Sequence, residues 1–258
     1  MARSLLFVSR MEVSLYSAAA AMNATERWED LVADNLSMTA VPGARQREIS
    51  FTAVQAGLAS ASPDSATNNF VIPFAGATTN FSQGELKSTG GNLDTALEGP
   101  GFFTVEMPDG SKGYTRDGEF KLNNQGQLTT KQGYTVVSNG GTLTFDPTNT
   151  AAITIAVDGQ VSQGPDLKGK IAVTEFANLK ALSDVGGGFF KAEGPLAAPK
   201  AASTTSVRQG FVEASNTSPT LAMASLINSS RMFESNQKVM EMQSDRMSKT
   251  IQDLSGTT

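Results

Sequence analysis

The sequence of 258 residues contains no histidine and no cysteine. Without histidine there is no imidazole general base, no Ser-His or Cys-His pair, and no zinc site that needs imidazole nitrogen. Without cysteine there are no thiolate nucleophiles, iron–sulfur clusters or disulfides. Any catalysis would have to use carboxylate, lysine or hydroxyl groups, whereas the absence of cysteine is compatible with every compartment.

The chain also lacks a basic excess and long apolar runs. Its 20 Lys+Arg against 25 Asp+Glu give a net charge of -5, so we expect no nucleic-acid partner. No stretch approaches the ~20 apolar residues of a membrane span. The apolar run Leu5–Val8 is interrupted by Arg10 and Glu12 before it reaches the roughly 7–15 residues of a signal-peptide core. We therefore expect neither membrane insertion nor a cleaved signal peptide.

Glycine and methionine are distributed unevenly along the chain. None of the 24 glycines lies in the first 42 residues, and only Gly256 follows Gly210, whereas nine of the ten methionines lie in these two ends. Because glycine is costly inside helices and methionine favours them, the ends are predicted to be helical and the middle turn-rich. The predicted divisions are an N-terminal helix (1–42), an extended connector (43–80), a β-rich domain (81–215) and a C-terminal helix (216–258).

The C-terminal helix is the clearer of the two. Ser218 is a good N-cap and Pro219 occupies the tolerated first helical position. The apolar residues on one face recur every seven positions, with Met232 and Val239 broadening that face: Leu226, Phe233, Met240, Met247 and Leu254. A helix of about 37 residues is roughly 55 Å long. A stripe so long and narrow resembles a coiled-coil seam.

The N-terminal helix has a matching stripe. Val8, Leu15 and Met22 follow heptad spacing, and the stripe then shifts to Trp28 and Leu31. The two helices could simply pack on the middle domain. Their similar lengths favour antiparallel pairing with each other, combined with packing against other molecules.

The middle of the chain is predicted to be β. Strand-like runs such as 102–107, 153–157 and 207–213 are separated by turn sequences such as Asp117-Gly118. With no helical stretch between them, they indicate an antiparallel sandwich or irregular barrel. Residues 55–69 are rich in Ala, Ser, Thr and Asn without a sustained period, which is typical of a connector. The fold class is therefore α+β: a central antiparallel all-β domain flanked by two long helices that pair as a coiled-coil-like stalk.

Nucleotide and nucleophile motifs are incomplete. Gly164-x-x-x-x-Gly169-Lys170 has Ile171 where a P-loop needs Ser or Thr for magnesium, and a strand-like run follows it instead of a helix. Ser235-x-x-Lys238 has the spacing of a Ser-Lys pair, but it lies mid-helix without the companion motifs and is interpreted as a solvated helix face.

Carboxylate pairs leave one enzymatic alternative open. Asp94 with Glu98, or Asp117 with Glu119, could serve glycoside hydrolysis, although aromatic sugar platforms are scarce. A non-catalytic surface adhesive module is a further alternative. The main hypothesis is a protein that is not an enzyme, with no catalytic residues, no cofactor and no metal.

Several motifs follow one another in a specific order. Asp34–Met38 precedes the turn Val41–Arg45 and then Phe51. The later motifs are Gly91-Asn-Leu-Asp-Thr-Ala-Leu-Glu-Gly-Pro-Gly-Phe-Phe103, Tyr114-Thr-Arg-Asp-Gly-Glu-Phe120, Gln209-Gly-Phe-Val-Glu-Ala-Ser-Asn216 and Arg231-Met-Phe-Glu-Ser-Asn-Gln-Lys-Val239. In this order they resemble the flagellar hook-basal body rod proteins over nearly the whole chain. The first box is divergent: Asp34 replaces Asn, Ser37-Met38 replaces Ala-Asn, Val41 replaces Thr and Ala44 replaces an aromatic residue. At Asp117 the family pattern has Asn.

The resemblance implies a structural subunit of the bacterial flagellar basal-body rod that transmits torque for motility. Such subunits are exported unfolded, without a cleaved signal peptide, by the flagellar type III export apparatus. They stack helically in the periplasm-spanning rod with copies of themselves and with other rod and hook proteins. The terminal helices would form an inner coiled-coil layer and the β domain an outer layer. The short chain before the Leu-Asp-x-Ala element and the Pro-Gly of the first box favour the proximal-rod type over the distal-rod type.

An exposed apolar seam on each helix would be covered only by sister molecules. A heterologous contact repeated by a screw operation then builds a filament. The predicted assembly interface is Val8, Leu15, Met22, Trp28, Leu31, Asn35, Leu36, Leu226, Phe233, Met240, Met247 and Leu254.

Overall fold

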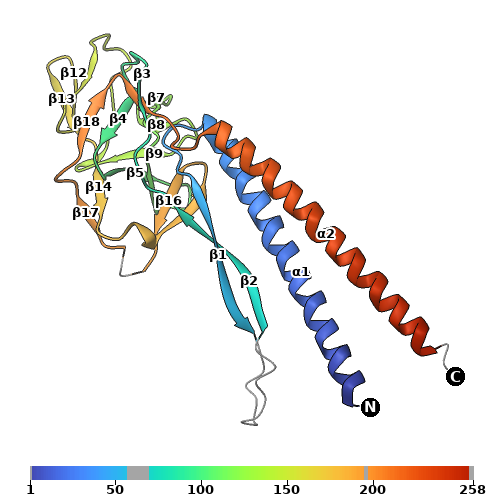
Figure 1. Ribbon diagram of the computed structural model, residues 1–258. Coiled ribbons are helices and arrows are strands. Elements are labelled where there is room, and N and C mark those ends of the chain that lie inside the picture. Colours follow the sequence, from blue (N-terminus) through green and yellow to red (C-terminus); the bar gives the residue numbers. More distant parts are fainter. Residues whose placement is uncertain (1, 57–69, 195–196, 256–258) are drawn as a thin grey trace. The chain divides into compact units, whose positions relative to one another are not determined.

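A computed structural model describes residues 2–56, 70–194 and 197–255, with side chains at 18–50, 76–194 and 197–252 (Figure 1). The chain forms two compact units. The helical unit comprises Met1–Asp34, Arg47–Thr78 and Thr220–Thr258, and the β unit comprises Asn35–Gln46 and Thr79–Pro219. Each unit is therefore assembled from segments far apart in the sequence.

Two long helices dominate the helical unit. Helix α1 spans Ala2–Ser37 and leads into the short 3-10 helix η1 (Met38–Ala40), and α2 spans Pro219–Ser255 (Figure 1). Both helix predictions are confirmed, including the start of α2 at its proline. Among the described residues, no helix is both long enough and apolar enough to cross a membrane.

Two strands lie within the connector expected at 43–80. Strands β1 (Arg47–Ala56) and β2 (Phe70–Thr79) pair as a two-stranded sheet. The sequence from Ile49 to Ala53 alternates apolar and polar residues, and this period of two favours a strand. Of the aperiodic stretch 55–69, residues 57–69 lie outside the described residues.

The described residues of the β unit form one branched sheet and three smaller ones. The main sheet has the order β15-β16-β6-β5-β9-β8-β7, with β10 pairing β9 and β14 joining β5 to β17; β11-β12-β13, β18-β4 and β19-β3 form separate sheets. The strand pairings in the described part of this unit are antiparallel, as predicted. The bounds are β3 Leu86–Ser88, β4 Thr95–Glu98, β5 Phe102–Glu106, β6 Lys112–Thr115, β7 Phe120–Leu122, β8 Leu128–Thr130, β9 Thr135–Ser138, β10 Gly141–Thr142, β11 Ile153–Ile155, β12 Gln160–Gln163, β13 Asp166–Lys170, β14 Val173–Phe176, η2 Leu179–Ala181, β15 Leu182–Gly186, β16 Phe189–Ala192, β17 Pro199–Ala201, β18 Ser206–Gln209 and β19 Phe211–Glu213.

The run predicted as one strand at 207–213 is divided in the structure. Gly210 has a φ of +77°, a left-handed conformation that breaks the strand and that glycine adopts without steric cost. The residues before it form β18, which pairs with β4, and those after it form β19, which pairs with β3. One continuous apolar pattern therefore serves two sheets.

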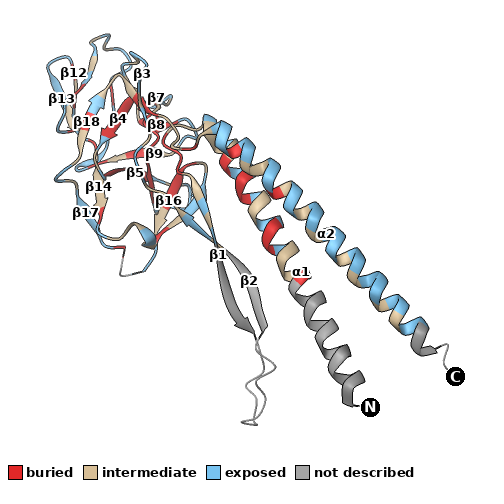
Figure 2. Cartoon of the chain, viewed as in Figure 1, coloured by how far each residue is buried: buried red, intermediate tan, exposed pale blue. Residues whose placement is uncertain are grey.

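The core of the β unit has two parts, because consecutive residues of a strand face opposite sides of a sheet. Phe103 and Phe189 belong to the larger apolar cluster, whereas their neighbours Phe102 and Phe190 belong to the smaller one. Burying each such side chain is worth about 1.5–3 kcal/mol. Figure 2 shows buried residues concentrated in these strands, whereas most of the described part of α2 is exposed.

Candidate functional site

Three charged side chains form a buried cluster in the β unit, which we call the connector cluster: Arg45, Arg116 and Glu213. Arg45 Nη1 lies 2.6 Å from Glu213 Oε1, and Arg116 Nη1 lies 3.2 Å from Glu213 Oε2. The side chains are 0–3% exposed. The backbone N–H of Gly84 donates a third hydrogen bond to Glu213 Oε1 at 2.8 Å. One carboxylate therefore binds three separate chain segments.

The connector cluster holds two guanidinium groups and one carboxylate, so it buries an excess positive charge. Burial lowers the pKa of Arg116 to about 10; the charge of Glu213 opposes this effect and that of Arg45 adds to it. Arg116 also donates from Nη2 to Gly99 O at 2.6 Å, and its guanidinium lies 4.9 Å from the ring centre of Phe102. Arg116 remains charged near neutral pH, and removal of its carboxylate partner would be costly.

Beside this cluster, main-chain hydrogen bonds join the segment that follows α1 to the segment that precedes α2. Gly43 N–H donates to Glu213 O at 2.8 Å, and Asn216 N–H donates to Ala44 O at 3.3 Å. The Asn216 side chain accepts from Gln46 N–H at 2.6 Å. The segment that follows α1 is thus paired with the segment that precedes α2, although about 170 residues separate them.

The side-chain amide of Asn216 extends this pairing to the segment that follows the β1–β2 hairpin. Its Nδ2 donates to Asn80 O at 2.9 Å and to Ser82 O at 3.0 Å. Close approach also explains the glycine of the first box: Gly43 has a φ of +67°, and a Cβ there would lie 2.3 Å from the carbonyl carbon of Arg116. These contacts leave no room for another side chain at this position.

The connector cluster was not predicted from the sequence. Its members lie in three of the recognised motifs, 41–45, 114–120 and 209–216, but they are 97 and 168 residues apart. No local periodicity relates residues at such separations. The available signal was a single charged residue in each of the motifs 41–45 and 209–216, Arg45 and Glu213 respectively, whereas the motif 114–120 holds three charged residues.

Asp117 is a second buried charge, in the turn next to the cluster. It is 2% exposed, and burial raises its pKa to about 6. The hydrogen bond that its Oδ1 accepts from Glu119 N–H and the charge of Lys131 lower the pKa, whereas the carboxylates of Glu119 and Asp94 raise it. At neutral pH the folded chain therefore holds a poorly solvated carboxylate.

Helix α2 has a half-buried face with a clear heptad period. From Arg231 to Gln252 every side chain off this face is exposed. Leu226, Phe233, Met240 and Met247 lie on the face, and Leu254 is outside the described side chains. Between these apolar residues, the same face carries small or polar side chains that are also buried or half-buried: Ala222, Ser229, Asn236, Gln243 and Thr250.

Two residues expected on this face lie elsewhere. Met232 is 48% exposed and Val239 is 38% exposed, so the prediction that they broaden the half-buried face is wrong. Met232 directly precedes Phe233, and Val239 directly precedes Met240. Because successive residues of an α-helix are rotated by about 100°, Met232 and Val239 point away from the half-buried face. The half-buried face is instead completed by small and polar side chains such as Ser229 and Asn236.

Helix α1 is covered more fully than α2 over its described side chains. Leu31 and Asn35 are buried, whereas Met22, Trp28 and Leu36 are half-buried. Val8 and Leu15 lie outside the described side chains. The buried or half-buried set also includes Ala18, Ala21, Ala24, Thr25 and Val32.

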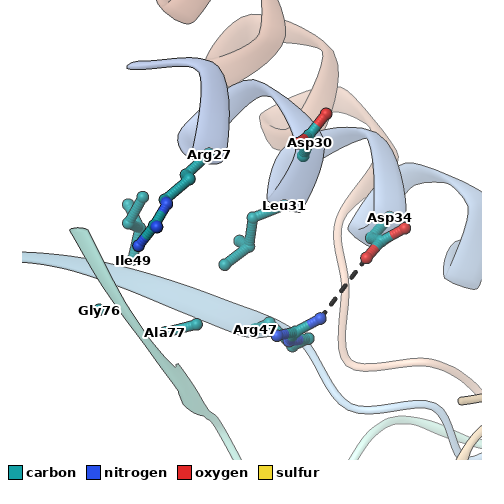
Figure 3. Close-up of a pocket in the computed structure, with 8 residues that line it drawn as sticks. All are labelled: Arg27, Asp30, Leu31, Asp34, Arg47, Ile49, Gly76 and Ala77. Carbon is teal, nitrogen blue, oxygen red and sulfur yellow. Dashed lines mark hydrogen bonds and ion pairs between the residues drawn. The ribbon is translucent and has the colours of Figure 1, made fainter. Parts of the chain in front are cut away.

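A pocket of about 260 Å³ lies within the helical unit, between α1 and the β1–β2 hairpin. Figure 3 shows Arg27 and Leu31 reaching from α1 toward the hairpin, with Asp34 paired to Arg47 at 3.5 Å. The remaining lining residues are Asp30, Ile49, Gly76 and Ala77. The pocket is therefore lined by both apolar residues and charged residues of both signs.

The carboxylates considered for hydrolysis have structural partners. Glu98 pairs with Arg208 Nε at 2.7 Å, and Asp94 accepts a hydrogen bond from Thr89 Oγ1 at 2.6 Å. Within the described part of the chain, no group of three or more acidic side chains is placed to hold a metal ion.

Two family models match this chain. The model described as "Flagellar hook protein FlgE/F/G D1 domain" matches residues 96–163, and the model described as "Flagellar basal body rod FlgEFG protein C-terminal" matches residues 208–253. The second match includes Glu213 and nearly all of α2.

Whole-length relatives agree with these matches. The chain is 32% identical over 232 residues to the flagellar basal-body rod protein FlgF of Caulobacter vibrioides, with 90% of this chain and 93% of the relative covered. It is 31% identical over 255 residues to the rod protein FlgG of Borreliella burgdorferi (91% and 95% covered) and 30% identical over 249 residues to FlgG of Bacillus subtilis (88% and 93% covered).

The connector cluster yields a stability prediction. Glu213→Gln leaves two buried guanidinium groups without their carboxylate, so we expect a loss of about 3–5 kcal/mol in the free energy of unfolding, measured by urea denaturation of the full chain. Glu98→Gln is the matched control: it breaks the half-exposed pair with Arg208 and should cost about 1 kcal/mol or less. Equal losses in the two variants would show that burial of the cluster carries no special energetic weight.

The raised pKa of Asp117 yields a pH prediction. Since the folded chain holds this proton more tightly than the unfolded chain, the contribution of Asp117 to the free energy of unfolding falls as the pH rises from about 4 to about 6. Moving the pKa from 3.8 to about 6 corresponds to roughly 2–3 kcal/mol. Asp117→Asn should therefore raise the melting temperature at pH 7.5 and have little effect at pH 4, whereas exposed Asp166→Asn should change neither. A benefit of Asp117→Asn that did not grow with pH would contradict this assignment.

Proposed function

This chain belongs to the flagellar basal-body rod protein family, and we propose from that premise how its helices and β unit build a rod. It is a structural subunit of the rod and not an enzyme. We propose that it assembles helically with copies of itself and with other rod and hook proteins, its terminal helices forming an inner coiled-coil layer. The β unit would form the outer layer.

The observation that carries the proposal is the incomplete burial of α2. Leu226, Phe233, Met240 and Met247 are only half-buried in a single chain. Burying apolar surface is worth roughly 25 cal/mol per Å², so covering this face with another helix stabilises an assembly. In a family whose members form a rod, the partners available to cover it are sister subunits and other rod proteins.

We infer that α1 completes the same interface. Met22, Trp28 and Leu36 keep part of their surface exposed, while Leu31 and Asn35 are already buried within the chain. The first three would therefore gain most from a neighbouring subunit. Val8, Leu15 and Leu254 are assigned to the interface from their heptad positions.

Torque transmission requires that a load on the helical unit reach the β unit without unravelling either one. The chain passes between the units at residues 34/35, 46/47, 78/79 and 219/220. The connector cluster and Asn216 bind the segments adjoining three of these crossings to one another. A mechanical load on one of these segments would thus be distributed over the other two.

We further propose that the subunit lies in the periplasm-spanning rod and reaches it unfolded through the flagellar type III export apparatus, without a cleaved signal peptide. Long helices with half-buried faces support this route, because isolated helices are marginal until they find packing partners. Within the family we favour the proximal-rod type, on the short chain before the Leu-Asp-Thr-Ala element and the Pro42-Gly43 of the first box.

Phe233→Asp tests the assembly face of α2. The charge would be buried wherever α2 meets another helix, so we expect loss of rods and of swimming in a strain carrying only this variant. The β unit should remain folded, because Phe233 lies in the other unit; β-sheet circular dichroism of the purified variant checks this point.

Ala224→Asp is the control for this experiment. It places the same charge on an exposed position of the same helix and should leave swimming intact. Normal swimming with Phe233→Asp would refute the proposed role of this face.

A further inference from the structure

The connector cluster does not use all of its hydrogen-bond donors. Three of its nitrogens are buried and have no acceptor among the described residues: Arg45 Nε, Arg45 Nη2 and Arg116 Nε. The Arg45 side chain is 0% exposed and the Arg116 side chain is 3% exposed. Buried donors without an acceptor are rare in folded proteins, and they are most costly on charged groups.

The two unused nitrogens of Arg45 lie on the same edge of its guanidinium. The Nε–H and one N–H of Nη2 point in parallel from this edge, which gives the fork that binds an anion through two hydrogen bonds. Glu213 Oε1 is bound at the third nitrogen, Nη1, at 2.6 Å. The ion pair between Arg45 and Glu213 therefore does not use the fork.

The charges of the connector cluster do not balance either. Two guanidinium groups face the single carboxylate of Glu213, and no second carboxylate in the described part of the chain pairs with either arginine. Asp117 directly follows Arg116, but its Oδ1 accepts a hydrogen bond from Glu119 N–H instead. The cluster thus buries an excess of one positive charge, and the charge of Arg45 lowers the pKa of Arg116.

A small anion meets both requirements at once. It would accept the hydrogen bonds of the Arg45 fork and cancel the excess charge, whereas a buried water molecule would accept the hydrogen bonds and leave the charge uncompensated. An anion with one negative charge matches the excess of one. A divalent phosphate or sulfate would reverse the imbalance.

We propose that the connector cluster binds a monovalent anion of the size of chloride, held by the Nε and Nη2 fork of Arg45. Because these donors are closed to solvent, the anion enters as the β unit folds. The stability of the β unit then rises with the concentration of the anion, as for any ligand that binds only the folded state. This inference goes beyond the proposed function and does not depend on it, since it concerns the folding of the chain and not its assembly.

Thermal unfolding of the purified full chain, followed by β-sheet circular dichroism, tests for the anion. Sodium chloride is compared with sodium gluconate at equal concentrations, because gluconate matches the ionic strength and is too large for a buried cluster. Above the dissociation constant, each tenfold rise in chloride should raise the melting temperature by about 3–6 °C more than the same rise in gluconate. Equal responses to the two salts would overturn the proposal.

Arg45→Lys tests the place of binding. Lysine keeps a positive charge opposite Glu213 but lacks the fork, so the chloride-specific rise in melting temperature should disappear. Arg208→Lys is the matched control: it makes the same substitution in the half-exposed pair with Glu98 and should keep the full rise. A chloride-specific rise that survives Arg45→Lys would reject the fork as the site.

Bromide locates the anion without any substitution, which covers the case in which Arg45→Lys does not fold. Crystals of the full wild-type chain grown in sodium bromide should give an anomalous scattering peak at hydrogen-bonding distance from both Nε and Nη2 of Arg45. Ordered water at the fork, or bromide peaks confined to the protein surface, would overturn the proposal.

Discussion

The structure depends on one carboxylate, that of Glu213, which is completely buried and shared by Arg45, Arg116 and Gly84. A buried charge is tolerated only when its hydrogen-bonding capacity is used. Here the partners come from the segment after α1, a turn of the β unit and the segment after the hairpin. The electrostatic requirement of a single side chain therefore fixes where distant parts of the chain meet.

The helical unit is stabilised in a different way. The β unit buries two apolar clusters of its own, while α2 keeps its heptad face half-buried and its residues Leu221, Met232 and Met242 exposed. Helices of this length obtain most of their stability from tertiary packing. The β unit thus has apolar cores within the chain, whereas α2 leaves apolar surface incompletely covered.

The sequence predicted those features that arise from local patterns. The start of α2 follows from Pro219, a residue tolerated at the first helical position. Leu226, Phe233, Met240 and Met247 follow from a seven-residue repeat. Local patterns failed where tertiary structure decides: Met232 and Val239 were assigned to the half-buried face, but the smaller and more polar residues Ser229 and Asn236 lie there instead. The connector cluster is beyond such reasoning, because a pairing between Arg45 and Glu213 has no signature in the residues between them.

The hydrogen bond from Gly43 to Glu213 brings the segment that follows α1 and the segment that precedes α2 together. A domain whose entry and exit points coincide behaves as an insertion into its host. Over evolutionary time such an insertion can grow, shrink or be exchanged for another fold without altering the geometry of the helices that carry it. The β unit can in this way diversify while α1 and α2 are kept.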